Sequence, residues 1–194
     1  MLQQVASDLT ELLLKKEIVK EQDKEIYTYG FEAMFSTIIN TILVLAIGIM
    51  AGTLLETLIY LVCFALLRVY CGGYHAKTHV GCVLTFVGLY GSAMYIPHLI
   101  PAQYNGLLSI AIGGISLTAI LLYAPIEHPN RPFVGNEYKT FRKLARIIAL
   151  LEAALIVFIS AFCKDFSKIA LIISIAMISV VFMLALAKII ERKR

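Results

Sequence analysis

Six long apolar stretches, each nearly free of charged side chains, occupy most of this chain of 194 residues. A helix needs roughly 20 apolar residues to cross a bilayer, so six crossings use up most of the length. Charged residues make up only 15% of the chain, whereas soluble domains carry about 25%. We therefore predict an all-α integral membrane protein with about six transmembrane helices. The predicted spans are residues 34–55, 57–70, 80–96, 106–123, 147–163 and 169–187.

The N-terminal segment differs from these stretches because it is amphipathic. Leu2, Leu9 and Leu12 recur at helical spacing, and acidic residues lie between them. Such a helix either lies flat in the membrane interface or packs on the cytosolic side of the protein itself, and the sequence leaves both readings open. We predict a single membrane domain, with an amphipathic interfacial helix in residues 1–24 and a multi-span core in residues 28–194.

Basic residues are distributed unevenly between the two predicted faces. With both termini placed in the cytosol, all but two of the 17 Lys and Arg residues fall on the cytosolic side or at its boundary. Only Lys164 and Lys168 fall outside, as the positive-inside rule expects. We therefore predict that both termini and the proline-punctuated loop at 124–132 are cytosolic. The weakest span is the second, residues 57–70, because it is short.

The segment from Arg68 to Cys82 lies between the second and third spans, at the predicted cytosolic face. It contains His75 and Cys82, and imidazole and thiol are the groups from which a thiol nucleophile and its base are built. Gly72 and Gly73 permit backbone conformations closed to other residues and let a second chain approach closely. Cys82 falls near the beginning of the third span, where the partial positive charge of a helix N-terminus stabilises a thiolate. The four cysteines of the chain form no CxxC pair, so no disulfide framework is predicted.

Spacing alone does not select His75 as the base. In an unbroken helix, His75 and Cys82 would be about 10.5 Å apart along the axis, too far for a direct hydrogen bond. If His75 is the base, the chain between the two residues must be partly non-helical. His79 is three residues from Cys82 and would be its direct neighbour on a helix, so spacing favours His79.

The segment as a whole combines an arginine, the motif Gly-Gly-x-His-Ala, and a cysteine seven residues after the histidine. The matching residues are Arg68, Gly72, Gly73, His75, Ala76 and Cys82. This pattern closely resembles the signature of the accessory gene regulator protein B (AgrB) family. The resemblance extends to the length of the chain, the amphipathic start, the multi-span core and the basic loop containing prolines around 125–132.

Members of that family are bacterial membrane cysteine endopeptidases that process the precursor of a quorum-sensing peptide. The resemblance implies that His75 is the base and Cys82 the nucleophile, with Arg68, Gly72 and Gly73 as supporting residues. It implies a multi-pass protein of the bacterial cell membrane whose partners are the lipid bilayer and an AgrD-like precursor peptide. No cofactor, metal or nucleic acid is expected, and a homodimer is left open.

The resemblance also implies a reaction sequence. The Cys82 thiolate attacks the peptide bond after the signal segment, the charged C-terminal tail leaves, and the signal segment remains as an acyl-enzyme thioester. A cysteine or serine inside the precursor then attacks the thioester and closes a thiolactone or lactone ring. Because hydrolysis competes with this step, the enzyme must exclude water and hold the internal nucleophile close.

Several further roles are not assigned by the sequence. Backbone N–H groups at the start of the third span or at Gly72-Gly73 would suit an oxyanion hole. Arg68 would suit either recognition of an acidic tail or anchoring at the interface, and Glu152 is an ionisable group inside an apolar stretch. The candidates for a third residue that orients the histidine are Glu127, Asn130 and Asn136, each of which also fits an ordinary loop.

Two other function classes compete with the enzyme. Cys71, His75 and His79 are spaced four apart and would line one face of a continuous helix, as ligands for zinc or copper in a metal-ion transporter or sensor. Against this alternative, the glycines at 72 and 73 weaken such a helix, and no second ligand set appears in another span. A non-enzymatic membrane scaffold explains the hydrophobicity but not the residues between Arg68 and Cys82.

Overall fold

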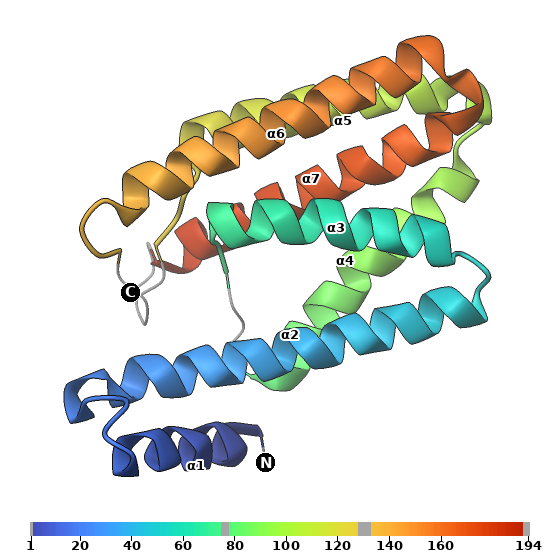
Figure 1. Ribbon diagram of the computed structural model, residues 1–194. Helices are drawn as coiled ribbons and strands as arrows, with labels where there is room; N and C mark the ends of the chain where they lie inside the picture. Colours follow the sequence, from blue (N-terminus) through green and yellow to red (C-terminus); the bar gives the residue numbers. More distant parts are fainter. Residues whose placement is uncertain (1, 75–77, 128–132, 192–194) are drawn as a thin grey trace.

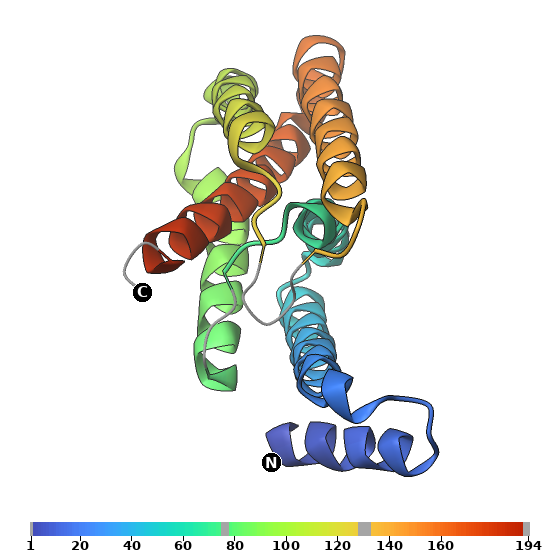
Figure 2. The same ribbon diagram turned by 90° about the vertical axis from the view of Figure 1, so that its left-hand side faces the viewer.

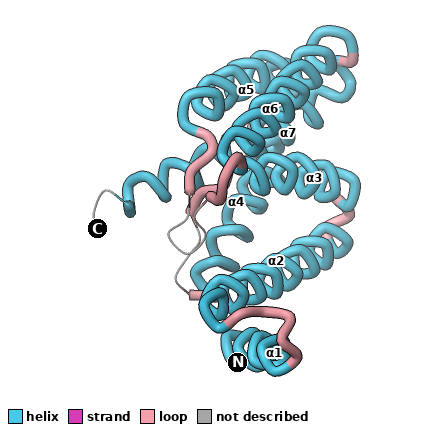
Figure 3. Tube along the Cα trace, turned by 60° about the vertical axis from the view of Figure 1, so that its left-hand side comes forward, coloured by secondary structure: helices cyan, strands magenta, loops and turns pink. Residues whose placement is uncertain are grey.

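The computed structural model describes residues 2–74, 78–127 and 133–191, and every long element in these ranges is a helix (Figures 1 and 3). The helices are α1 (Leu2–Lys15), α2 (Lys24–Met50), α3 (Leu54–Cys71), α4 (His79–Leu99), α5 (Ala102–Tyr123), α6 (Glu137–Phe162) and α7 (Ser167–Glu191), with short 3-10 turns at Glu21–Asp23 and Lys164–Phe166. Six of the helices, α2 to α7, are long and apolar enough to cross a membrane. The prediction of an all-α membrane protein with six spans is confirmed.

The boundaries of the first two spans differ from the prediction. The stretch 34–55 was predicted to be one span, but the helix of this first span, α2, begins at Lys24 and ends at Met50. Gly52 adopts φ 68°, and the Thr53 N–H donates to the Gly48 carbonyl at 2.8 Å, which closes a turn inside the apolar run. The second span therefore begins at Leu54 and has 18 residues, enough to cross the bilayer.

Two other boundaries were also predicted wrongly. Pro97 does not end α4, which continues to Leu99, since helices in a membrane tolerate proline where neighbouring groups satisfy the freed backbone. The helix α6 begins at Glu137, ten residues before the predicted span at Ile147. The Glu137 carboxylate accepts a hydrogen bond from the Val134 N–H at 3.2 Å, which secures this early start. The added turns carry basic residues, and Arg146 donates to the Leu121 carbonyl at 3.0 Å.

The helix α7 is the centre of the bundle and packs against α3, α4, α5 and α6 (Figure 1). Its side chains from Ala170 to Met177 are almost completely buried. Because lipid tails are as apolar as leucine, association inside a membrane depends on close packing and on hydrogen bonds between helices. Such bonds join α3 to α4, through Thr57 and Tyr90 at 2.8 Å, and α5 to α6, through Ser109 and Ser160 at 2.9 Å.

The N-terminal helix α1 folds back beneath α2 and crosses it obliquely (Figures 1 and 2). Thr10 is buried and accepts a hydrogen bond from Thr28 of α2 at 3.1 Å, and Glu11 pairs with Lys24 at 3.7 Å. One face of α1 thus packs on the protein itself, while Val5 and Leu12 stay about half exposed. Of the two arrangements that the sequence left open for α1, packing on the protein is observed. Contact of the exposed apolar face with the membrane interface stays a prediction.

The connections divide between the two ends of the bundle. The short turns between α2 and α3, α4 and α5, and α6 and α7 lie at one end (Figure 1). The beginning of α2, the end of α7 and the longer connections after α3 and α5 lie at the other. There Gly72 pairs with Ile126 in a single β-bridge, so the described first residues of the two connections lie side by side (Figures 2 and 3).

Candidate active site

The residues after α3 form a sharp, glycine-dependent turn. The helix ends at Cys71, and Gly72 and Gly73 adopt φ of 68° and 113°, a region that L side chains rarely occupy. The part-buried Arg68 guanidinium donates hydrogen bonds to the Gly72 carbonyl, to the Gly73 carbonyl at 3.4 Å and to the Tyr74 carbonyl at 2.5 Å. The Arg68 guanidinium therefore stabilises this turn through hydrogen bonds to three consecutive carbonyl groups.

The turn is also held from its two sides. The Tyr74 N–H donates to the Met183 carbonyl of α7 at 3.0 Å, and the Ile126 N–H donates to the Cys71 carbonyl at 3.0 Å. A Cβ added at Gly72 would collide with the Ile126 carbonyl oxygen, and one added at Gly73 would lie 2.7 Å from Arg68 Nη1 and 3.2 Å from the Met183 carbonyl. Both glycines are therefore required by backbone conformation and by space.

Replacing Gly73 with alanine is expected to displace the turn and to reduce any activity of the site at least tenfold. The left-handed conformation alone costs a side chain about 1–2 kcal/mol, before the contact with Met183 is counted. Gly88→Ala is the matched control, because Gly88 has no unusual φ and no atom within 4 Å of an added Cβ. Equal activity of the two variants, measured at equal protein level, would show that the turn does not set the geometry of the site.

Cys82 lies in the first turn of α4. Thr78 is the N-cap residue with extended backbone (φ −124°, ψ 145°), and its hydroxyl accepts a hydrogen bond from the Gly81 N–H at 3.1 Å. The Thr78 carbonyl accepts the Cys82 N–H at 3.0 Å. The cap places the partly exposed thiol within the field of the helix N-terminus, as the sequence predicts.

Two groups from other helices lie near this thiol. Asn40 of α2 is only 5% exposed, and its Nδ2 donates a hydrogen bond to Cys82 Sγ at 3.6 Å. The Arg68 guanidinium is close enough to interact electrostatically with both Cys82 and Cys71. The structure thus brings Arg68, the two glycines and Cys82 into one region, and it adds Asn40, which sequence reasoning missed. The available signal was the single carboxamide within the uncharged stretch 34–55.

The position of the base remains a prediction. His75 lies outside the described residues, as does the side chain of His79, whose backbone opens α4. The extended backbone of Thr78 interrupts any helix between His75 and Cys82, which meets the condition that His75 needs. The same break, with α3 ending at Cys71, removes the continuous helix on which the metal alternative depends. Cys71 itself is fully buried in the bundle.

The other candidates from the sequence have structural surroundings of their own. The Glu127 carboxylate accepts the Phe133 N–H at 2.5 Å, so it closes its own loop. Asn136 precedes α6 without a side-chain capping bond, and Asn130 lies outside the described residues. Glu152 is 6% exposed on the inner face of α6, and its carboxylate oxygens have no hydrogen-bond partner within the described ranges.

A wide cleft of about 810 Å³ adjoins the glycine turn. Arg68, Gly72 and Gly73 line it on one side, and the first turns of α2 line it on another, with aromatic and apolar side chains such as Tyr27 and Phe31. The loop and the start of α6 contribute Ile126, Phe133 and Phe141. An extended peptide with apolar side chains would fit against such a surface.

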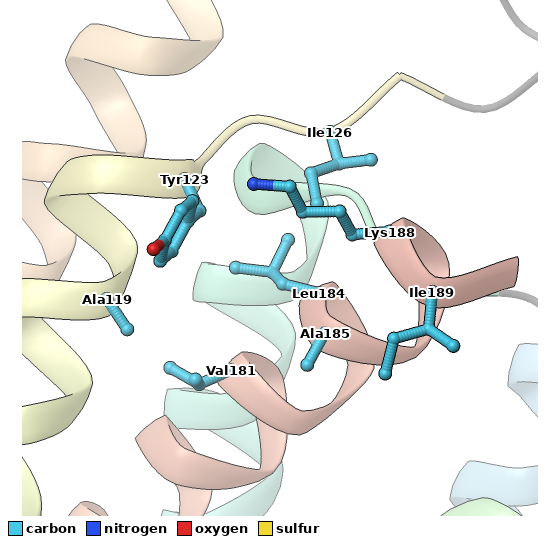
Figure 4. A pocket seen from close by; sticks show the side chains of 8 residues that line it. All are labelled: Ala119, Tyr123, Ile126, Val181, Leu184, Ala185, Lys188 and Ile189. Carbon is cyan, nitrogen blue, oxygen red and sulfur yellow. The ribbon is translucent and has the colours of Figure 1, made fainter. Parts of the chain in front are cut away.

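A smaller cleft of about 340 Å³ lies between α5 and α7 (Figure 4). Its lining is apolar apart from Tyr123 and Lys188, and the Lys188 ammonium lies 4.3 Å from the centre of the Tyr123 ring. Figure 4 shows the Lys188 side chain extending across the top of the cleft toward that ring. The residues that line this cleft provide no thiol and no imidazole, so it is not the candidate active site.

Comparison with known proteins places the chain in a family. The family model described as accessory gene regulator B matches residues 6–184. An AgrB-like protein of Listeria monocytogenes serotype 4b (strain CLIP80459) is 28% identical over 147 residues, covering 74% of this chain and 71% of that protein. AgrB-like protein 2 of Clostridium perfringens (strain 13 / Type A) is 30% identical over 124 residues, covering 60% of this chain and 56% of that protein.

Accessory gene regulator protein B of Staphylococcus carnosus (strain TM300) is 26% identical over 136 residues, covering 70% of this chain and 68% of that protein. No solved structure matches the chain. The family match covers α2 to α6, most of α7 and the whole segment from Arg68 to Cys82. The chain belongs to the accessory gene regulator B family.

Proposed function

We propose that this protein is a cysteine endopeptidase of the bacterial membrane that removes the C-terminal tail of an AgrD-like propeptide. Family membership already implies a role in accessory gene regulator quorum sensing. The observation that carries the finer proposal is the setting of Cys82, a partly exposed thiol in the first turn of a capped helix, beside the Asn40 amide and within electrostatic range of Arg68. A structural cysteine needs none of these neighbours.

In the proposed reaction His75 takes the proton from Cys82 Sγ, and the thiolate attacks the carbonyl carbon of the scissile peptide bond. The C–N bond then breaks, the proton passes from His75 to the leaving amine, and the tail departs with a new N-terminus. The signal segment stays on Cys82 as a thioester. A thiol or hydroxyl within that segment attacks the thioester carbon and releases the ring, returning the proton to the enzyme.

The wide cleft beside the glycine turn supports the placement of the substrate. Its α2 side ends at Met34, six residues before Asn40, which corresponds to about 9 Å of helix. An extended chain covers that distance in about three residues. The apolar part of the propeptide near the scissile bond would therefore lie in the cleft, while the site itself lies beside Asn40 and Cys82.

The orientation in the membrane is part of the proposal. Thiol-labelling probes near both termini should report the cytosol, and probes near Gln103 and Asp165 should report the outside. The distribution of basic residues supports this arrangement. Among the described Lys and Arg residues, only Lys164 and Lys168 lie at the connection between α6 and α7, which is at the end of the bundle opposite the glycine turn (Figure 1). Cytosolic labelling near Gln103 would contradict it and would move the candidate site to the opposite face.

Reconstitution tests the function directly. The purified protein in liposomes of bacterial lipids, mixed with a synthetic AgrD-like propeptide, should release the free tail and a signal segment lighter by one water than the linear acid, as ring closure requires. Heat-treated protein is the control. Absence of both products with a protein that retains its helical spectrum would refute the endopeptidase.

A further inference from the structure

Acylation of Cys82 requires a hydrogen-bond donor for the oxyanion, and neither the thiol nor the histidine provides one. When Sγ attacks the scissile carbonyl, negative charge develops on an oxygen two bonds from Sγ. Enzymes stabilise such an oxyanion with preorganised N–H donors at about 2.7–3.1 Å, and removing one donor typically costs about 10²–10³ in kcat. A donor for this oxygen must therefore lie close to Cys82 Sγ.

Several of the backbone groups expected to provide this donor are already engaged. The Cys82 N–H donates to the Thr78 carbonyl and the Gly81 N–H to the Thr78 hydroxyl. At the glycine turn, the Gly72 N–H donates to the Arg68 carbonyl at 3.2 Å, and the Tyr74 N–H donates to Met183. These hydrogen bonds cap one helix and end another, so using them for an oxyanion would undo the structure that positions the thiol.

Asn40 of α2, which faces Cys82 of α4, provides a hydrogen-bond donor. Its Nδ2 lies 3.6 Å from Cys82 Sγ, and an oxygen bonded to a carbon on that sulfur comes within reach of the same amide. A carboxamide nitrogen carries two N–H groups, so it can serve the sulfur and the oxygen in turn. Burial of Asn40 in a membrane helix keeps water from competing for the donor.

A purely structural role accounts less well for this residue. A polar link between α2 and α4 would be expected to satisfy both ends of the buried amide, since an unmade hydrogen bond costs about 1–3 kcal/mol. Asn40 Oδ1 has no partner among the described residues, and neither has the Ser36 hydroxyl one turn earlier on the same buried face. The buried, unpartnered Oδ1 of Asn40 therefore lowers the stability of the fold, and packing alone does not explain why a carboxamide is placed there.

We propose that Asn40 is a catalytic residue of this site, the side-chain donor of the oxyanion hole for acylation of Cys82. The inference rests on the proposed function, because it requires that Cys82 attack a peptide carbonyl. It replaces the expectation of a hole built from backbone N–H groups alone.

The test compares Asn40→Ala and Asn40→Leu with Ser36→Ala, a matched control on the same face of α2. Three quantities are measured in liposomes: kcat and KM for release of the propeptide tail, and the rate at which iodoacetamide alkylates Cys82 across pH. The two Asn40 variants should lose about 10²–10³ in kcat with little change in KM. Because the amide also donates to Cys82 Sγ, alkylation at neutral pH should change as well, but by far less than kcat. Ser36→Ala should behave as the wild type.

The outcomes separate the two proposals. Unchanged kcat in both Asn40 variants would refute the oxyanion role while leaving the endopeptidase intact. A kcat loss accompanied by an equal loss of alkylation at neutral pH would also refute it, since Asn40 would then act on the thiolate. A wild type that alkylates at Cys82 but releases no tail would refute the function itself. A wild-type helical spectrum, with the buried Cys63 and Cys71 still protected from iodoacetamide, shows that the variants are folded.

Discussion

Cys82→Ala is expected to abolish release of the propeptide tail while leaving membrane insertion and precursor binding intact. Loss of a catalytic nucleophile costs on the order of 10⁶ in kcat where it has been measured in a related type of site. The side chain is small and lies partly exposed in the first turn of α4, so its removal leaves the cap on Thr78 in place. Tail release is measured by mass spectrometry and binding by cross-linking of a labelled propeptide.

Cys71→Ala is the informative comparison for this experiment. Cys71 is fully buried at the end of α3 and interacts electrostatically with the same Arg68 guanidinium. We expect it to retain substantial activity, because a buried thiol there has no open approach to a peptide. Cleavage that survives in Cys82→Ala and disappears in Cys71→Ala would reverse the assignment of the nucleophile.

The second large effect concerns the base. His75→Ala should lose about 10²–10⁴ in kcat, as expected for removal of a general base, whereas His79→Ala should keep most of the activity. The bend at Thr78 separates the two histidines: His79 begins α4, and His75 precedes the bend. The rate of tail release at several pH values provides the measurement. An inactive His79 variant beside an active His75 variant would show that helical spacing, and not the family motif, identifies the base.

The number and order of the membrane helices could be predicted from the sequence because apolar length is a local property. The ends of the helices depend on more than hydropathy. The turn at Gly52 lies inside an apolar run, and only its backbone geometry reveals that α3 begins at Leu54. The early start of α6 depends on a hydrogen bond between Glu137 and Val134 that no hydropathy pattern contains.

The candidate site divides in the same way. Glycines beside an arginine suggest a special turn, and the structure shows why each glycine is needed. The sequence left Arg68 between recognition of an acidic tail and anchoring at the interface, and neither reading included its hydrogen bonds to three carbonyl groups. Asn40 is 42 residues from Cys82 along the chain, so only the packing of α2 against α4 brings the two together. Periodicity and local motifs carry no information on such a contact.

The covalent intermediate tests the central claim most directly. A propeptide whose internal cysteine or serine is replaced by alanine lacks the ring-closing nucleophile, so the signal segment should accumulate on the enzyme. Mass analysis of the trapped protein at neutral pH should find the acyl group on Cys82, and hydroxylamine should release it as a thioester requires. If only the linear, hydrolysed signal segment appears, with no adduct on Cys82 even at the earliest times, the account of acyl transfer through this cysteine is contradicted.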